Sequence, residues 1–257
     1  MFLTNWKMTY AEHKALPCIA PCSMYSVLLQ HGLMDDPYYG MNELKATPLS
    51  EQDCIFETEF MVDENILQKE YVELKFYGLD TICCITVNGK VVDNVRNMHR
   101  EYVYDVKNIL VKGKNQICLH FSSPVEYFKK MNHKHWLYTN GDTIPGAAHL
   151  RKALYMSGWD WAPTLPDMGI FRPICIDAYD TDKIESIFVK QHHKNNKVIL
   201  DIEVETKHNA EADILVSVDG QKIKLDDQKG MVTIDNPKLW WVRGYGEQPL
   251  YEIKAEI

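Results

Sequence analysis

Residues 82–92, ICCITVNGKVV, decide the fold class of this chain. A strand-length apolar run ends in the dipeptide Asn88-Gly89 and resumes at Lys90. Asn-Gly tolerates the positive φ angles of a two-residue hairpin turn. Asp219-Gly220 separates a second pair of such runs, 214–218 and 221–225. Both stretches predict antiparallel β-hairpins.

Strict alternation of apolar and polar residues recurs elsewhere in the chain. The apolar members are Val72, Leu74 and Phe76; Ile117, Leu119 and Phe121; and Leu200, Ile202 and Val204. Successive side chains of a strand point to opposite faces, so each run predicts a half-buried strand. The fold class is therefore predicted to be all-β.

Helical signals are sparse. Ser23 is placed to cap a short helix that ends at Gly32, and a second helix is expected to begin near Pro124. From His133 to Pro166 the alternation fails while Gly, Pro, Trp and His accumulate. A long stretch without regular structure in a compact domain is usually functional, so we expect a functional loop there.

The polar junction Tyr179-Asp180-Thr181-Asp182 predicts a boundary between two domains, residues 1–182 and 183–257. The second domain is shorter than the ~100 residues that a seven-stranded β-sandwich needs. We therefore expect it to be truncated at its C-terminal end and the native reading frame to be longer. A stop codon directly after Ile257 would contradict this expectation.

Composition narrows the choice of partners. The chain has 257 residues and a net charge of −8, with no Lys/Arg run longer than two, so we expect no nucleic-acid partner. No apolar run approaches the ~18 residues of a membrane span, and we expect no membrane partner. The N-terminus lacks the pattern of a signal peptide. Seven cysteines, an odd number, are expected to be mostly buried thiols, which predicts a cytoplasmic protein.

No cofactor or metal is expected. His133 and His135 have a ligand-like spacing but lack a third ligand, and no glycine-rich phosphate loop is present.

A resemblance to a known family is carried by residues 151–163, RKALYMSGWDWAP. This run resembles the RKAQ…GWDWGP signature of β-mannosidases in glycoside hydrolase family 2. Further similar runs follow the family's order: DPYYGMNE at 36–43, GLDT at 78–81 with VNG at 87–89, NMHR at 97–100, GIFRPI at 169–174, NPKLWW at 236–241 and GYGEQPLY at 244–251.

The resemblance implies a jelly-roll (galactose-binding-like) sandwich, then a partial immunoglobulin-like sandwich, and then a (β/α)₈ barrel with two catalytic glutamates. A barrel needs about 250 residues by itself, so the barrel would be a missing C-terminal partner of the same chain. Asn42-Glu43 mimics the family's Asn-Glu acid/base signature but lies in a first-domain motif. No catalytic residue is therefore predicted within this chain.

The predicted substrate-binding residues are Trp159, Asp160 and Trp161. An indole can cover the apolar face of a pyranose, and a carboxylate can accept hydrogen bonds from two neighbouring hydroxyls. The resemblance implies that Asp160 binds sugar hydroxyls, that Trp159 packs against the ring or walls the pocket, and that Trp161 buttresses the loop. In the alternative interpretation, both indoles fill the core and Asp160 caps a turn. Arg151 and Lys152 would either bond within this loop or form a solvated pair.

The predicted function is the non-catalytic N-terminal portion of a retaining exo-β-mannosidase acting on terminal β-mannosides. A β-galactosidase, β-glucosidase or exo-β-glucosaminidase specificity stays open, because barrel residues largely set it. A free-standing carbohydrate-binding module is the alternative from another class. Such a module would bind sugar unaided, whereas half a pocket would bind a monosaccharide at millimolar strength or worse.

Overall fold

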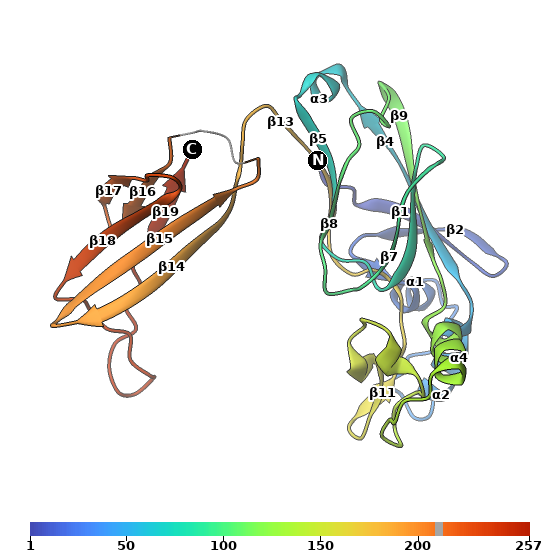
Figure 1. Cartoon of the computed structure of the whole chain (residues 1–257). Coiled ribbons are helices and arrows are strands. Elements are labelled where there is room, and N and C mark those ends of the chain that lie inside the picture. Colours follow the sequence, from blue (N-terminus) through green and yellow to red (C-terminus); the bar gives the residue numbers. More distant parts are fainter. Residues whose placement is uncertain (209–212) are drawn as a thin grey trace. The chain divides into compact units, whose positions relative to one another are not determined.

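The computed structural model describes residues 1–208 and 213–257 and divides them into two compact units, Met1–Tyr179 and Asp180–Ile257 (Figure 1). The division falls within the polar junction from which the sequence predicts a domain boundary at residue 182. Strands dominate both units, which confirms the all-β class.

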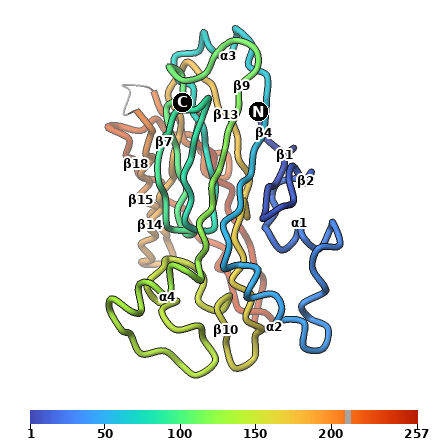
Figure 2. The backbone as a smooth tube through the Cα atoms, turned by 90° about the vertical axis from the view of Figure 1, so that its right-hand side faces the viewer, coloured from blue at the N-terminus to red at the C-terminus, as the bar shows by residue number. Residues whose placement is uncertain are grey.

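The first unit contains two principal sheets (Figures 1 and 2). The larger has the order β2-β1-β4-β9-β6-β7, with the bounds His13–Ile19, Asn5–Tyr10, Cys54–Val62, Gly113–Phe121, Ile82–Val87 and Lys90–Arg96. The smaller has the order β13-β5-β8, with the bounds Ile174–Tyr179, Tyr71–Phe76 and Tyr102–Asp105. Every pairing between neighbours is antiparallel.

One apolar core joins these sheets. Phe56 and Phe121 of the larger sheet meet edge to face at 5.7 Å between ring centroids. Leu74 and Phe76 of the smaller sheet belong to the same buried cluster. Because the inward side chains of both sheets share one core, the unit is a β-sandwich.

The predicted turns are present. Asn88 and Gly89 have φ of 49° and 77°, and Asp219 and Gly220 have φ of 47° and 89°. Positive φ at both central residues is the requirement of a type I′ hairpin turn. The first pair joins β6 to β7, and the second joins β16 to β17.

Both predicted helices are confirmed. α1 spans Met24–Gln30, and Ser23 caps it through a reciprocal pair of bonds with Ser26. α4 spans Pro124–Lys134, with Ser123 at its N-cap. Two further helices, α2 (Glu43–Ala46) and α3 (Glu64–Gln68), were not predicted, because they are too short to show a helical period.

The expectation that residues 133–166 lack regular structure is wrong. α4 extends to Lys134, and 3₁₀ turns occupy Ala147–His149 and Leu154–Met156. β10 (Ser157–Trp159) and β11 (Ala162–Thr164) form a small hairpin. Strands of three residues are too short to produce visible alternation. β12 (Gly169–Ile170) then pairs with β3 (Cys22–Ser23) and returns the chain to the sandwich.

The second unit is a smaller sandwich. One sheet has the order β14-β15-β18, with the bounds Ile184–Lys194, Lys197–Thr206 and Lys229–Asp235. The other has the order β17-β16-β19, with the bounds Gln221–Lys224, Leu215–Val218 and Ile253–Glu256. Its described core includes Leu200, Ile202, Val204, Val216, Val218 and Val232. Within the described ranges, no helix has the length and apolar character that crossing a bilayer demands.

Candidate functional site

The predicted binding residues lie at the tip of the β10–β11 hairpin. Trp159 pairs with Ala162, which leaves Asp160 and Trp161 as the two turn residues. Trp161 is 78% exposed and Trp159 is 37% exposed. Their rings meet edge to face at 6.4 Å between centroids. Both indoles therefore lie on the surface, and the alternative that buries them in the core does not hold.

Exposure also bears on the roles of the two indoles. A side chain that buttresses a loop is covered by its neighbours, yet Trp161 is the more open of the two. Trp161 thus offers the larger exposed surface of the two indoles. Asp160, which stands between them in the sequence, is exposed, and among the described residues its carboxylate has no hydrogen-bond or ion-pair partner. The carboxylate is free to accept bonds from a ligand.

The first strand of the hairpin is clamped by the preceding loop. Ile144 N donates to Ser157 O at 2.8 Å, and Thr143 Oγ1 donates to Gly158 O at 3.0 Å. Gly158 has φ of 107°, and a Cβ there would lie 2.0 Å from the carbonyl oxygen of Asp142. Only glycine permits this approach, so the loop fixes the base of the hairpin.

Lys152 is neither solvated nor bonded only within its loop. Its side chain is 1% exposed and pairs with the carboxylate of Asp80, which is 4% exposed. The same ammonium donates to the carbonyl oxygen of Asp167 at 2.7 Å. Arg151, in contrast, is exposed. Arg151 and Lys152 are neighbours in the sequence, yet one is exposed and the other is buried. The sequence alone does not reveal this difference.

Asp167 is a polar residue of this region that was not among the site residues predicted from the sequence. Its Oδ1 accepts from Tyr25 N at 3.0 Å and from Met168 N at 2.8 Å. Burial raises the pKa of Asp167 to about 6, against the lowering effect of these bonds, a bond with Ser23 and the charge of Lys152. Its context, Pro166-Asp167, is typical of a turn and gave no sign of a buried carboxyl.

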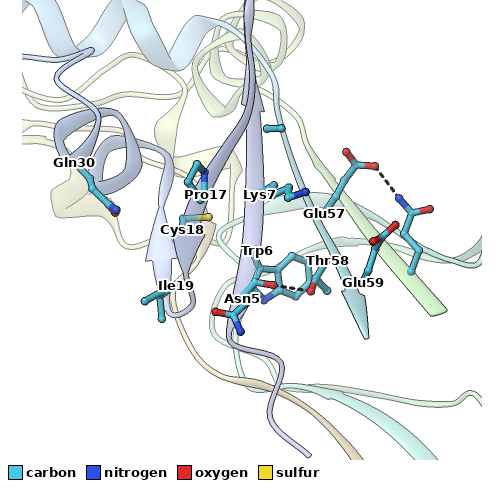
Figure 3. Close-up of a pocket in the computed structure, with 12 residues that line it drawn as sticks. Asn5, Trp6, Lys7, Pro17, Cys18, Ile19, Gln30, Glu57, Thr58 and Glu59 are labelled. Atoms are coloured by element: carbon cyan, nitrogen blue, oxygen red, sulfur yellow. Dashed lines mark hydrogen bonds between the residues drawn. The ribbon is translucent and has the colours of Figure 1, made fainter. Parts of the chain in front are cut away.

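A cavity of about 650 Å³ lies against β1, β2 and β4 (Figure 3). Its indole, Trp6, is 2% exposed and donates to Leu3 O at 2.8 Å, so no open ring is available for stacking. Glu57 accepts from Gln116 at 3.2 Å. The hairpin residues do not line this cavity. It therefore lacks the open aromatic face that the hairpin offers.

The candidate metal ligands His133 and His135 and the Asn42-Glu43 pair all lie in the described part of the chain, residues 1–208 and 213–257. No group of three or more His, Cys, Asp or Glu in that part of the chain is arranged to hold a metal ion. Asn42 precedes α2, and its side chain donates to Asp36 O at 3.1 Å. Asn42-Glu43 thus forms part of a local turn and helix start.

Known families match both units. Residues 6–172 match the family model described as glycosyl hydrolase 2 galactose-binding domain-like. Residues 183–257 match the model described as glycosyl hydrolases family 2. The chain belongs to glycosyl hydrolase family 2. The predicted family is thereby confirmed.

Relatives in this family include β-mannosidases. β-Mannosidase B of Emericella nidulans is 30% identical, over 92% of this chain and 30% of that protein. β-Mannosidase of Mus musculus is 28% identical, over 97% of this chain and 31% of that protein. The crystal structure of β-D-mannosidase from Dictyoglomus thermophilum matches with a TM-score of 0.85 and 27% identity, over 99% of this chain and 33% of that one. The chain thus spans about a third of the length of these relatives.

Proposed function

We propose that this chain is the non-catalytic N-terminal part of a retaining exo-β-mannosidase and that its hairpin tip contacts the terminal sugar. The observation that carries the proposal is the exposure of Asp160 at the hairpin tip, where its neighbours in the sequence on both sides are surface indoles. The family match and the β-mannosidase relatives supply the reaction class.

In this proposal, Asp160 accepts hydrogen bonds from two neighbouring hydroxyls of the terminal mannoside. Charge-assisted hydrogen bonds are about twice as strong as neutral ones. Trp161 covers an apolar C–H face of the ring, and Trp159 holds Trp161 from the side. These groups position the sugar without transferring a proton, so their contribution is orientation.

The catalytic carboxyl groups belong to a further part of the polypeptide. Retaining hydrolysis needs an acid/base and a nucleophile separated by ~5–5.5 Å. In our proposal, a (β/α)₈ barrel of the same polypeptide supplies both, and the 257-residue chain is inactive alone. The cytoplasmic location predicted from the cysteines is part of the same proposal and is testable with a fluorescent fusion.

The hairpin proposal is tested by titrating the chain with methyl β-D-mannopyranoside and following the indole N–H signals by NMR. We expect the Trp159 and Trp161 signals to shift with a Kd of about 1 mM or weaker, equivalent to about −4 kcal/mol at most. Asp160→Ala should abolish the shifts. Trp136→Ala, which removes an indole that is 72% exposed outside the hairpin, is the matched control.

The same titration separates the alternatives. Stronger shifts with methyl β-galactoside or β-glucoside would favour another β-glycosidase of the family. Micromolar binding by the chain alone would favour a free-standing carbohydrate-binding module. Indole signals that do not respond to any of these sugars would contradict the proposed role of the hairpin.

A further inference from the structure

We propose that the cavity beside the hairpin, bounded by Tyr38, Tyr155 and Asp167, binds the second pyranose of a β-linked disaccharide. The second pyranose is the sugar to which the terminal sugar is attached. The proposal rests on the proposed function of the hairpin and extends it by naming a further contact and its ligand.

The cavity has a volume of about 420 Å³ and is lined mainly by apolar atoms from α1, the Pro37–Tyr38 segment and β11. Small-molecule sites are typically ~300–1,000 Å³, with few polar groups on an apolar lining. A pyranose ring therefore fits the available space.

The cavity lies next to the hairpin tip. Its wall includes Ala162 and Pro163, which follow Trp161 directly along β11. A strand rises about 3.3 Å per residue, so this wall begins within about 7 Å of the Trp161 backbone. A sugar attached to one held at the tip can reach it.

The polar and aromatic groups of the cavity suit a sugar. Tyr38 and Tyr155, which line the cavity, are 76% and 61% exposed. Asp167 contributes a carboxylate that accepts from Tyr25 N and Met168 N through one oxygen and also bonds with Ser23. A carboxylate has about four acceptor positions, so capacity for ligand hydroxyls remains. Aromatic faces and a carboxylate are the same combination that the hairpin presents.

The floor of the cavity is fixed before any ligand binds. Leu165 N donates to Met156 O at 3.0 Å, and Thr47 Oγ1 donates to Thr164 O at 3.1 Å. Tyr25 OH donates to Ala46 O at 2.8 Å. A preformed floor reduces the entropy cost of binding and confines adjustment to the two tyrosines.

The experiment compares β-1,4-mannobiose with methyl β-D-mannopyranoside on the 257-residue chain by NMR titration. We expect the disaccharide to bind at least about fivefold more tightly, equivalent to about 1 kcal/mol. Tyr38→Ala and Tyr155→Ala should remove this gain and leave the affinity for methyl mannoside unchanged. The matched controls are Tyr39→Ala and Tyr138→Ala, because these tyrosines are 78% and 82% exposed but do not line the cavity.

The outcomes separate the two proposals. Equal affinity for both sugars, with responding indoles, overturns the cavity proposal alone. Disaccharide binding that the two tyrosine variants weaken, with indoles that do not respond, overturns the hairpin proposal alone. If the control variants also lose the tighter binding of the disaccharide, the cavity proposal is overturned. If neither sugar binds, both the cavity proposal and the hairpin proposal are overturned.

Discussion

The ammonium of Lys152 donates a hydrogen bond to the carbonyl oxygen of Asp167 at 2.7 Å while it pairs with the buried carboxylate of Asp80. Lys152 precedes the β10–β11 hairpin and Asp167 follows it. Asp80 in turn exchanges backbone bonds with Gly169, at 2.9 Å and 2.7 Å. One cation thus ties both ends of the hairpin segment to the sandwich.

Lys152→Met should destabilise the chain strongly, because it leaves the carboxylate of Asp80 buried without its partner. Removal of one member of a buried pair typically costs about 3–5 kcal/mol. Urea denaturation of the two proteins measures the difference in the free energy of unfolding. Arg151→Met is the control and should change it by less than about 0.5 kcal/mol, because Arg151 is exposed. Equal losses for the two variants would contradict the role of the buried pair.

Gly158→Ala should loosen the hairpin, because φ is 107° and the new Cβ would clash with the Asp142 carbonyl. Backbone strain of this kind costs about 1–3 kcal/mol. The Ile144 amide donates to Ser157 O, so its rate of hydrogen exchange measures how often the loop separates from β10. Gly141→Ala is the matched control, since nothing lies within 4 Å of its Cβ position. Unchanged protection in Gly158→Ala would show that the loop does not clamp β10.

Asp167 should make the stability of the chain depend on pH. Its folded pKa of about 6 lies above the ~3.9 of an unfolded Asp, so the folded state binds the proton more tightly. The resulting stabilisation is fully present below about pH 4 and is lost as the pH rises through 6. A shift of about two units corresponds to about 3 kcal/mol.

Asp167→Asn isolates this contribution. The free energy of unfolding of the wild-type chain minus that of the variant should be larger at pH 4.5 than at pH 7.5. Urea denaturation at both pH values measures it, and Asp142→Asn, at an exposed position, controls for the loss of one negative charge. A difference that grows with rising pH would mean that the charge of Lys152 outweighs the burial of Asp167.

In the longer protein that we propose, Asp160→Ala should lower kcat/KM for an aryl β-mannoside by at least about 100-fold, equivalent to about 2.7 kcal/mol. The loss follows from removing two charge-assisted bonds to the sugar. Trp136→Ala should retain activity. Unchanged kinetics in Asp160→Ala, with an intact fold by circular dichroism, would contradict a binding role.

Much of the fold was predictable because its signals are local. The turns at Asn88-Gly89 and Asp219-Gly220 depend on two residues each, and the capping of α1 by Ser23 spans three. The short helix α2 and the β10–β11 hairpin were not predictable, because neither is long enough to show a period.

The sequence by itself determined the all-β class, the hairpin turns, the two longer helices and the family, since these follow from short-range patterns and from ordered motifs. Only the tertiary structure decided that Trp161 is open to solvent, that Lys152 is buried against Asp80 and that Asp167 lies beside a cavity. Burial and charge pairing depend on contacts between residues far apart in the chain, and Asp80 and Lys152 meet only when the sandwich closes.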